Sequence, residues 1–202
     1  QPVKFYYSGP LFRHDKPQKG RYREFYSSGI EVLGSPKSIM DAMVIHIGIL
    51  MLREAGINNI FLKINSIGDA ESRKDYQKEL INYYKKHLGK MSATDRQRLK
   101  DNPLRILDSK DPNLLEINAE APQSVSFLNN TSKKHFKEVM ENLDELGIDY
   151  EIDHTLVRGL DYYTHTVFEF FTLDEKKNEE EIKDGEKVEL APKTLALGGG
   201  GR

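Results

Sequence analysis

Cysteine and tryptophan are both absent from this chain of 202 residues. The absence of cysteine excludes a disulfide scaffold, a thiol nucleophile and any zinc or iron–sulfur site with cysteine ligands. Long apolar runs are missing too, since no stretch approaches the roughly 18 consecutive apolar residues of a membrane span, and no charged-then-apolar leader opens the chain. We therefore expect a soluble, cytoplasmic protein with no membrane partner.

The chain also lacks a large net charge. Its 30 Lys and Arg residues nearly balance its 32 Asp and Glu residues, which gives a formal net charge of −2. The field of the whole protein then does not steer a polyanion, so any contact with nucleic acid must come from a local basic patch. What the chain does have is 38% hydrophobic residues, enough to build a core within one or two modest domains.

Apolar patterning predicts an α+β fold built on a mostly antiparallel sheet. Aromatic and β-branched residues indicate two antiparallel strands joined by a long loop. Apolar residues at i, i+3, i+4 and i+7 then indicate a helix, with Ser38 as its N-cap and Gly56 as its C-terminal stop. The expected strands cover residues 5–12, 24–33, 60–64, 150–157, 162–172 and 195–197, and the expected helices cover 39–55, 69–87, 92–100 and 132–146.

A change of character along the chain predicts two domains. Charged helices fill residues 69–147, which predicts a small helical domain inserted into a sheet domain made of residues 1–68 and 148–202. Residues 174–189 are rich in Lys and Glu and have no apolar face, so we expect a solvated hairpin tip there. Because the chain starts at Gln1 in a strand-like run and stops after a run of glycines, we interpret it as a piece of a longer protein.

Five cationic side chains crowd the loop between the first two expected strands. Arg13 stands at the end of a strand, where a rigid element would let its planar guanidinium grip a phosphate through two hydrogen bonds. Lys16, Lys19, Arg21 and Arg23 follow in or beside the loop and suit a polyanion or a leaving phosphate. A solvated, charged turn explains the same composition, and the spacing alone does not decide between the two.

A second polar group follows an apolar strand. Arg158 comes first, Gly159 permits a turn, and the adjacent Tyr162 and Tyr163 are expected to point to opposite faces of the next strand. The alternative is a β-turn in which Arg158 pairs with Asp161 while one tyrosine lies in the core.

Neither the histidines nor the terminal glycines form a motif of known spacing. His46, His87 and His135 lie in helical runs and are interpreted as surface or packing residues, so no protein-ligated metal is expected. The four glycines at residues 198–201 could let backbone approach a ligand. They match neither the dinucleotide fingerprint nor the phosphate-binding loop of nucleotide hydrolases.

Two longer stretches resemble a known family. Phe12–Phe25 with Gly29–Gly34 closely resembles motif 2 of the histidyl-tRNA synthetases, which are class II aminoacyl-tRNA synthetases. Leu156–Thr164 resembles the signature particular to that family, and both stretches occur in the family's order. The resemblance covers essentially the whole chain. It implies that residues 69–147 are the family's helical insertion domain and favours a functional site over the two structural alternatives above.

The resemblance implies an enzyme that forms histidyl-adenylate from histidine and Mg²⁺–ATP and passes the histidine to tRNA(His). In this family pattern Arg13 would hold the α-phosphate and the amino-acid carboxylate, Phe25 would stack on adenine and Asp15 would lie near the adenine amino group. Arg158 would be the second catalytic residue, which stabilises charge on the α-phosphate. The weaker contacts implied for tRNA or pyrophosphate are Lys19, Arg21 and Arg23.

The same resemblance implies the histidine pocket. Glu31 would pair with the substrate imidazole, Tyr162 and Tyr163 would line the pocket, and Arg158 would reach the substrate as well. Ser27 stands where the family usually has a glutamine that contacts the substrate's α-amino end. A hydroxyl is too short to replace that amide directly, so a water or another residue would fill in.

The family's motif 1, motif 3 and anticodon-binding domain have no counterpart in the sequence, so we expect this piece alone to be a weak or inactive enzyme. A homodimer is implied for the whole protein by the family only. The alternative is a non-catalytic paralogue, such as the regulatory subunit of ATP phosphoribosyltransferase or a synthetase-like regulatory domain. The presence of Arg13, Glu31 and Arg158 argues against that alternative, and near-neutral charge argues against a general basic RNA-binding module.

Overall fold

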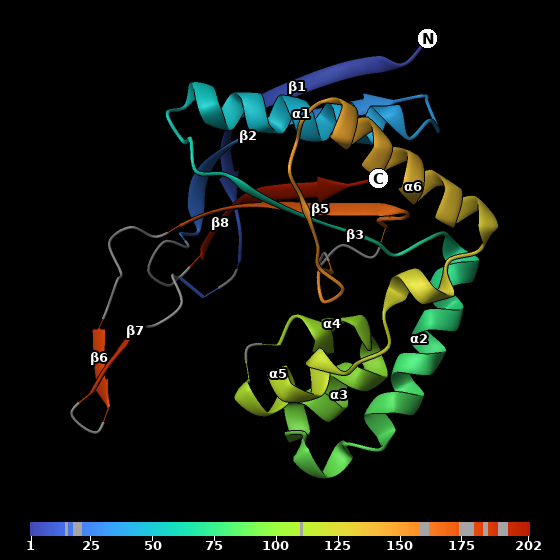
Figure 1. Cartoon of the computed structure of the whole chain (residues 1–202), viewed down its shortest axis with the longest axis vertical. Helices are drawn as coiled ribbons and strands as arrows, with labels where there is room; N and C mark the ends of the chain where they lie inside the picture. The colour runs from blue at the N-terminus through green and yellow to red at the C-terminus, as the bar shows by residue number, and fades with distance from the viewer. Residues whose placement is uncertain are drawn as a thin grey trace.

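The computed structural model describes residues 1–14, 16–17, 22–109, 111–157, 162–173, 180–183, 186–189 and 194–202. Figure 1 shows a sheet with helices along one face and a further group of helices set apart from it. In chain order the elements are β1 (Val3–Phe12), β2 (Glu24–Leu33), α1 (Ile39–Glu54), β3 (Phe61–Ser66), α2 (Ala70–Lys85), η1 (Leu88–Lys90), α3 (Ala93–Asp101), α4 (Leu104–Leu107), α5 (Pro112–Ala119), η2 (Ser124–Phe127), α6 (Asn130–Glu145), β4 (Glu151–Ile152), β5 (Thr166–Leu173), β6 (Glu180–Lys183), β7 (Glu186–Glu189) and β8 (Thr194–Gly201).

The strands β1 and β2 form the predicted antiparallel hairpin. Their register runs without a shift from Val3 opposite Leu33 to Phe12 opposite Glu24. Among the described strands they pair only with each other, so they make a sheet of their own. The prediction of this hairpin from its aromatic and β-branched residues is confirmed, with β1 starting two residues earlier than expected.

Four other strands form the central sheet in the order β4–β3–β5–β8. β5 is antiparallel to both β3 and β8, and only the short β4 is parallel to β3. The expectation of a mostly antiparallel sheet is therefore confirmed. β6 and β7 pair separately as an antiparallel hairpin, which lies at the lower left in Figure 1.

The strand expected over 150–157 is wrong in length, since β4 contains only two residues. A local turn ends it. The carboxylate of Asp153 accepts hydrogen bonds from both the backbone N–H and the hydroxyl of Thr155, at 2.9 and 2.6 Å. Such a side-chain turn offers the backbone an alternative to the strand ladder.

The strand expected over 162–172 begins only at Thr166. His165 explains the late start, because its φ of 50° lies in the left-handed region and breaks the extended backbone. Tyr162 and Tyr163 therefore precede the strand, and their rings lie against each other with centroids 5.0 Å apart. The expectation that they point to opposite faces of a strand is wrong.

The sequence predicted that the run of glycines follows a strand that ends at residue 197. In the structure the glycines lie inside the strand. β8 contains all four, and it pairs with β5 from Leu173 opposite Thr194 to Val167 opposite Gly201. A Cβ at Gly200 would come within 2.9 Å of the Phe168 ring, so the absence of a side chain lets that ring lie close to the strand.

The helices α1 and α6 lie side by side on one face of the central sheet (Figure 1). Gly56, at φ 88°, ends α1 as predicted. Ser38 is the N-cap residue of α1 as predicted, but its hydroxyl donates to Glu138 of α6 at 2.7 Å and makes no cap hydrogen bond. The buried cluster of this layer contains Ala42, Ile45, Ile49, Leu62, Ile64, Leu128, Phe136, Val139, Leu143, Phe168 and Phe170.

The helices α2 to α5 have a separate core. In it the hydroxyl of Tyr84 donates to the side-chain oxygen of Asn118 at 2.8 Å, and the Asn118 amide donates to the carbonyl of Ile106 at 2.8 Å. α6 contributes to the core of the sheet instead. The domain limits at residues 68 and 147 stay predictions, and this packing favours a helical unit that ends before α6.

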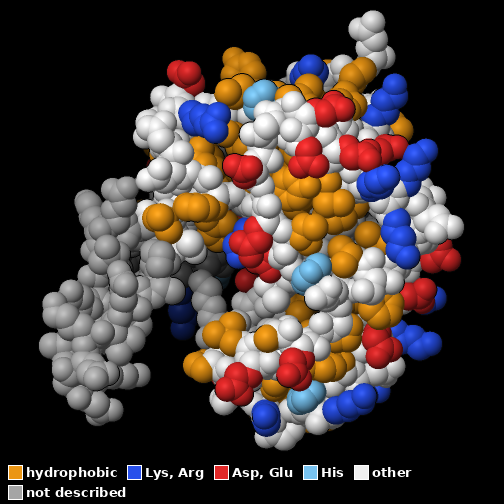
Figure 2. All heavy atoms as spheres, in the orientation of Figure 1, with side chains coloured by type: hydrophobic (Ala, Val, Ile, Leu, Met, Phe, Trp, Pro, Cys, Tyr) orange, Lys and Arg blue, Asp and Glu red, His pale blue; other side chains and the backbone are white. Residues whose placement is uncertain are grey.

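Acidic and basic side chains are interspersed over the face shown in Figure 2. This mixture agrees with the small net charge of the sequence. Within the described residues, no helix combines the length and the apolar character needed to cross a membrane.

Candidate functional site

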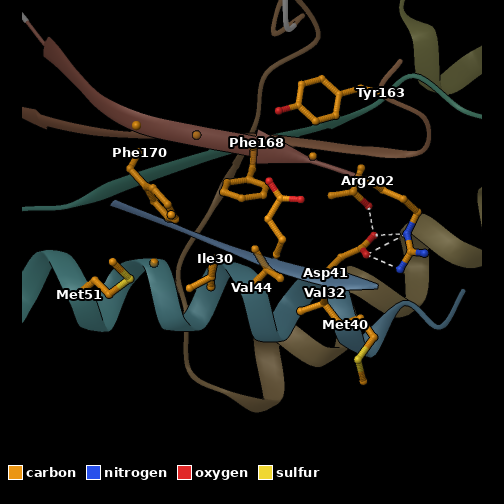
Figure 3. A pocket seen from close by; sticks show the side chains of 18 of the residues that line it. Ile30, Val32, Met40, Asp41, Val44, Met51, Tyr163, Phe168, Phe170 and Arg202 are labelled. Atoms are coloured by element: carbon orange, nitrogen blue, oxygen red, sulfur yellow. Dashed lines mark hydrogen bonds and ion pairs between the residues drawn. The ribbon is translucent and has the colours of Figure 1, made fainter. Parts of the chain in front are cut away.

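A cavity of about 520 Å³ lies where β2 and α1 face β5 and β8 (Figure 3). In that view Phe168 and Phe170 point from β5 toward α1 and β2. Gly48 of α1 allows the close approach, because a Cβ there would come within 2.7 Å of the Phe170 ring. The volume lies within the range of small-molecule sites in proteins. The apolar residues of the lining are Ile30, Val32, Leu33, Met40, Val44, Met51, Leu52, Phe168, Phe170 and Leu197.

Four residues predicted for the histidine pocket line this one cavity. Ser27 and Glu31 come from β2, whereas Tyr162 and Tyr163 come from the segment before β5, more than a hundred residues later in the chain. The structure therefore brings together two segments that only the family resemblance connected. The glycines of β8 form part of the wall.

Two residues predicted for ATP lie at the far end of the hairpin and do not line the cavity. The guanidinium carbon of Arg13 sits 3.7 Å above the centroid of the Phe25 ring, a cation–π contact. The backbone N–H of Arg13 donates to the carbonyl of Arg23 at 2.8 Å and extends the hairpin pairing. Within the described part of the chain, the Nε of Arg13 is buried without a hydrogen-bond partner.

Four predicted site residues lie outside the described residues. They are Asp15, Lys19, Arg21 and Arg158. Their roles stay predictions, as does the contact of Arg23 with tRNA or pyrophosphate. In the described residues, no group of three His, Asp or Glu side chains could hold a metal ion.

Asp41 is a cavity residue that the sequence analysis missed. It lies in the first turn of α1, is 8% exposed, and accepts hydrogen bonds from Thr166 Oγ1 at 2.7 Å and Arg202 Nε at 2.9 Å. Its Oδ2 also pairs with His135 Nε2 at 2.8 Å. Burial by itself would raise the pKa of Asp41, but the hydrogen bonds from His135, Arg202 and Thr166 and the charge of Arg202 outweigh it and hold the pKa below its usual value. Asp41 is therefore ionised at neutral pH.

A signal for Asp41 does exist in the sequence. Together with Ile45 and Ile49 it follows an i+4 spacing, so an acidic residue occupies a position on the buried stripe of the helix. A carboxylate in such a place must have partners. Its partners come from residues 135, 166 and 202, which no local pattern could have named.

His165 is next to His135, one of the partners of Asp41. Its ring lies against that of His135 at an interplanar angle of 34°, with centroids 4.8 Å apart. Burial lowers the pKa of His165, the neighbouring His135 and Arg202 lower it further, and Asp69 and Asp41 oppose the shift without cancelling it. His165 is therefore neutral at pH 7.

The central sheet, its two covering helices and the separate hairpin beside the cavity define the α+β fold of a class II aminoacyl-tRNA synthetase. The solved structure of apo histidyl-tRNA synthetase from S. aureus has this fold and matches with a TM-score of 0.69 at 34% sequence identity. The match covers 100% of this chain and 43% of that chain.

The chain belongs to the histidyl-tRNA synthetase family, since that family's model matches residues 1–185. The histidine–tRNA ligase of Pediococcus pentosaceus is 45% identical over 174 residues, which are 86% of this chain and 41% of that protein. The histidine–tRNA ligase of Bacillus subtilis is 45% identical over 172 residues, 85% of this chain and 41% of that protein. The chain thus spans about two-fifths of the length of these curated relatives. The resemblance and the fold class inferred from the sequence are both confirmed.

A structure described as an ATP phosphoribosyltransferase regulatory subunit/histidyl-tRNA synthetase from Bacillus halodurans also matches. Its TM-score is 0.52 at 21% identity, over 85% of this chain and 48% of that chain. At this identity the match shows a shared fold only.

Proposed function

We propose that this chain carries the histidine-binding site of a histidine–tRNA ligase. The observation that carries the proposal is the convergence of Ser27, Glu31, Tyr162 and Tyr163 on one cavity with an apolar lining. The whole protein would use histidine, Mg²⁺–ATP and tRNA(His) as substrates, act as a homodimer and reside in the cytoplasm. The family membership supports each of these points.

Recognition of imidazole requires an acceptor and a donor at a fixed separation. The Glu31 carboxylate can accept from one ring N–H, and a tyrosine hydroxyl can donate to the other ring nitrogen. An amino acid without these two ring atoms would forgo both hydrogen bonds, which are worth about 0.5–1.5 kcal/mol for a neutral partner and about 1.5–3 kcal/mol for a charged one. The apolar lining strengthens the selection because it offers no substitute partners.

The proposed chemistry needs no covalent group on the enzyme. An oxygen of the histidine carboxylate attacks the α-phosphorus of ATP, a new P–O bond forms, and the bond to pyrophosphate breaks. Arg13 and Arg158 are proposed to flank the α-phosphate, where they hold the reactants in line and stabilise the added negative charge. A ribose hydroxyl at the 3′ end of the tRNA then attacks the carbonyl carbon of the adenylate, and AMP leaves with the electron pair of the broken bond.

The first test is binding of L-histidine to this chain, measured by isothermal titration calorimetry. Glu31→Gln is expected to weaken binding by about 10- to 100-fold, as for loss of a hydrogen bond to a charged group. Glu24→Gln is the matched control, because Glu24 lies on the same strand but away from the cavity. Equal loss in both variants, or equal affinity for L-histidine and L-phenylalanine, would contradict the proposed pocket.

A second test separates the enzyme from a regulatory paralogue. In the whole protein, histidine-dependent exchange of pyrophosphate into ATP is expected, and Arg158→Ala should lower its rate by 100-fold or more while ATP affinity stays nearly unchanged. Histidine binding without any exchange would indicate the regulatory paralogue. A large loss of ATP affinity with an unchanged rate would contradict the role given to Arg158.

A further inference from the structure

Three walls of the cavity meet at a single carboxylate. Asp41 belongs to α1, Thr166 is the first residue of β5, and Arg202 directly follows β8. The carboxylate accepts from the hydroxyl of Thr166 and from the guanidinium of Arg202. His135 brings α6 to the same group, and Figure 3 shows Asp41 and Arg202 joined at one end of the cavity.

Arg202 is tied to both sides of the cavity at once. Its guanidinium also donates to the carbonyls of Ser35 and Lys37, just before α1, at 3.1 and 2.9 Å. Its backbone belongs to the other side, since its N–H donates to the carbonyl of Thr166 at 3.0 Å and its carbonyl accepts from the N–H of Thr164 at 2.8 Å. The end of β8 is therefore tied to the start of α1 by the Asp41 carboxylate and by the carbonyls of Ser35 and Lys37.

Few other contacts fix the position of residues 198–201, the glycines of β8 that line the cavity. Among the described strands β8 pairs with β5 alone, and its residues 198–201 have no side chains to pack against α1. Leu197 is the residue of β8 that packs on the core of the sheet. The end of the strand nearest Asp41 thus depends on polar contacts for its placement.

We propose that Asp41 is a positioning residue of the cavity, whose carboxylate holds the end of β8 and the start of β5 at a fixed place opposite α1. The proposal rests on the proposed function, in that the ligand served is histidine. Asp41 acts through Arg202 and Thr166 and not by touching the ligand, because both of its oxygens already accept hydrogen bonds. With the wall fixed, Glu31 and Tyr163 can contact the same bound molecule from opposite sides.

Asp41→Asn tests the proposal, since it keeps the shape of the side chain and removes the charge that pairs with Arg202. Affinity for L-histidine is expected to fall at least 10-fold. Tyr84→Phe is the matched control, because it removes a buried hydrogen bond, to Asn118, in the separate core of α2–α5. Histidine affinity is expected to be unchanged in this control even where its thermal stability falls equally.

Amide hydrogen exchange followed by NMR gives a readout that needs no ligand. In Asp41→Asn the amides of Thr164 and Arg202, which form the pairing at the end of β8, are expected to exchange at least 10-fold faster, while those of α2 keep wild-type rates. Arg202→Gln, with a partly exposed side chain, serves if Asp41→Asn does not fold. The two substitutions together should weaken histidine binding little more than either alone.

Failure of the proposed function and failure of the positioning role give different results. If the wild-type chain binds no histidine, the proposed function fails, while the exchange rates still judge whether Asp41 holds the wall. Wild-type exchange at Thr164 and Arg202 in Asp41→Asn would overturn the positioning role. Unchanged histidine affinity in that variant, or the same loss in Tyr84→Phe, would overturn it as well.

Discussion

A single methyl group added at Gly201 should disturb the cavity wall, while the same group added at Gly198 should not. A Cβ at Gly201 would come within 2.8 Å of the carbonyl oxygen of Thr166 and 2.9 Å of a ring carbon of Tyr163. Both distances are shorter than real Cβ atoms show, and the first is to backbone that β5 holds in place. A Cβ at Gly198 has nothing within 4 Å. The two positions share one strand and the same substitution, so their difference isolates the close approach.

The magnitude follows from the geometry. Overpacking against fixed backbone costs about 1–3 kcal/mol, whereas Gly→Ala in open space is neutral or stabilises by up to about 1 kcal/mol through the unfolded chain. We expect the free energy of unfolding of Gly201→Ala to lie about 2 kcal/mol below that of Gly198→Ala. With a urea dependence of about 2 kcal/mol per molar, the midpoints should differ by about 1 M. Circular dichroism is a suitable signal, because the chain has no tryptophan.

Histidine binding supplies a second measurement on the same pair of variants. Gly201→Ala displaces the ring of Tyr163, so it should weaken L-histidine binding, and Gly198→Ala should bind as the wild type does. Coincident urea midpoints for the two variants would refute the reasoning, since they would show that the end of β8 shifts without cost.

Three further predictions concern stability and use the same urea titration. Phe136→Ala removes a buried ring from the core between α6 and α1 and should lower the free energy of unfolding by about 3–5 kcal/mol, a loss under 1 kcal/mol being the contrary result. Gly56→Ala forces a Cβ onto a residue at φ 88° and should cost about 1 kcal/mol; no change would show that this turn relaxes. The lowered pKa of His165 means that the unfolded chain takes up a proton more readily, so stability should fall as the pH drops from 7.5 through about 6.5. His165→Asn, which keeps a residue that tolerates positive φ, should flatten this dependence, and an unchanged slope would assign it to another group.

Much of the fold could be predicted because its signals are local. The β1–β2 hairpin follows from its aromatic and β-branched residues and α1 from the spacing of its apolar residues, and Gly56 ends α1 as expected. The two wrong strand predictions have local causes, the turn between Asp153 and Thr155 and the left-handed backbone at His165. At Ser38 a distant group competes with the local preference. Ser38 is a good N-cap by residue type, but Glu138 takes its hydroxyl, and propensity carries no information about a partner a hundred residues away.

The site divides in the same way. The resemblance predicted Glu31 and Tyr163 as neighbours, and both line one cavity. Periodicity alone placed the two tyrosines on opposite faces of a strand, because the left-handed backbone at His165 leaves no trace in an alternating pattern. Asp41 was missed because its role lies in long-range partners. His135, Thr166 and Arg202 come near its carboxylate only when the chain folds.

The pairing of β3 with β5 has a consequence for synthesis of the chain. Asn65 lies opposite Val167, so β3 leaves the ribosome about a hundred residues before its partner, a wait of about 5–20 s at ordinary rates of translation. The core of α2–α5 is made from residues within that interval, and local helical contacts form far faster than strands widely separated in sequence can pair. The helices α2–α5 can therefore pack before β5 has been synthesised. Once β5 follows, their compact fold would hold it closer to β3 than an unstructured loop of the same length would.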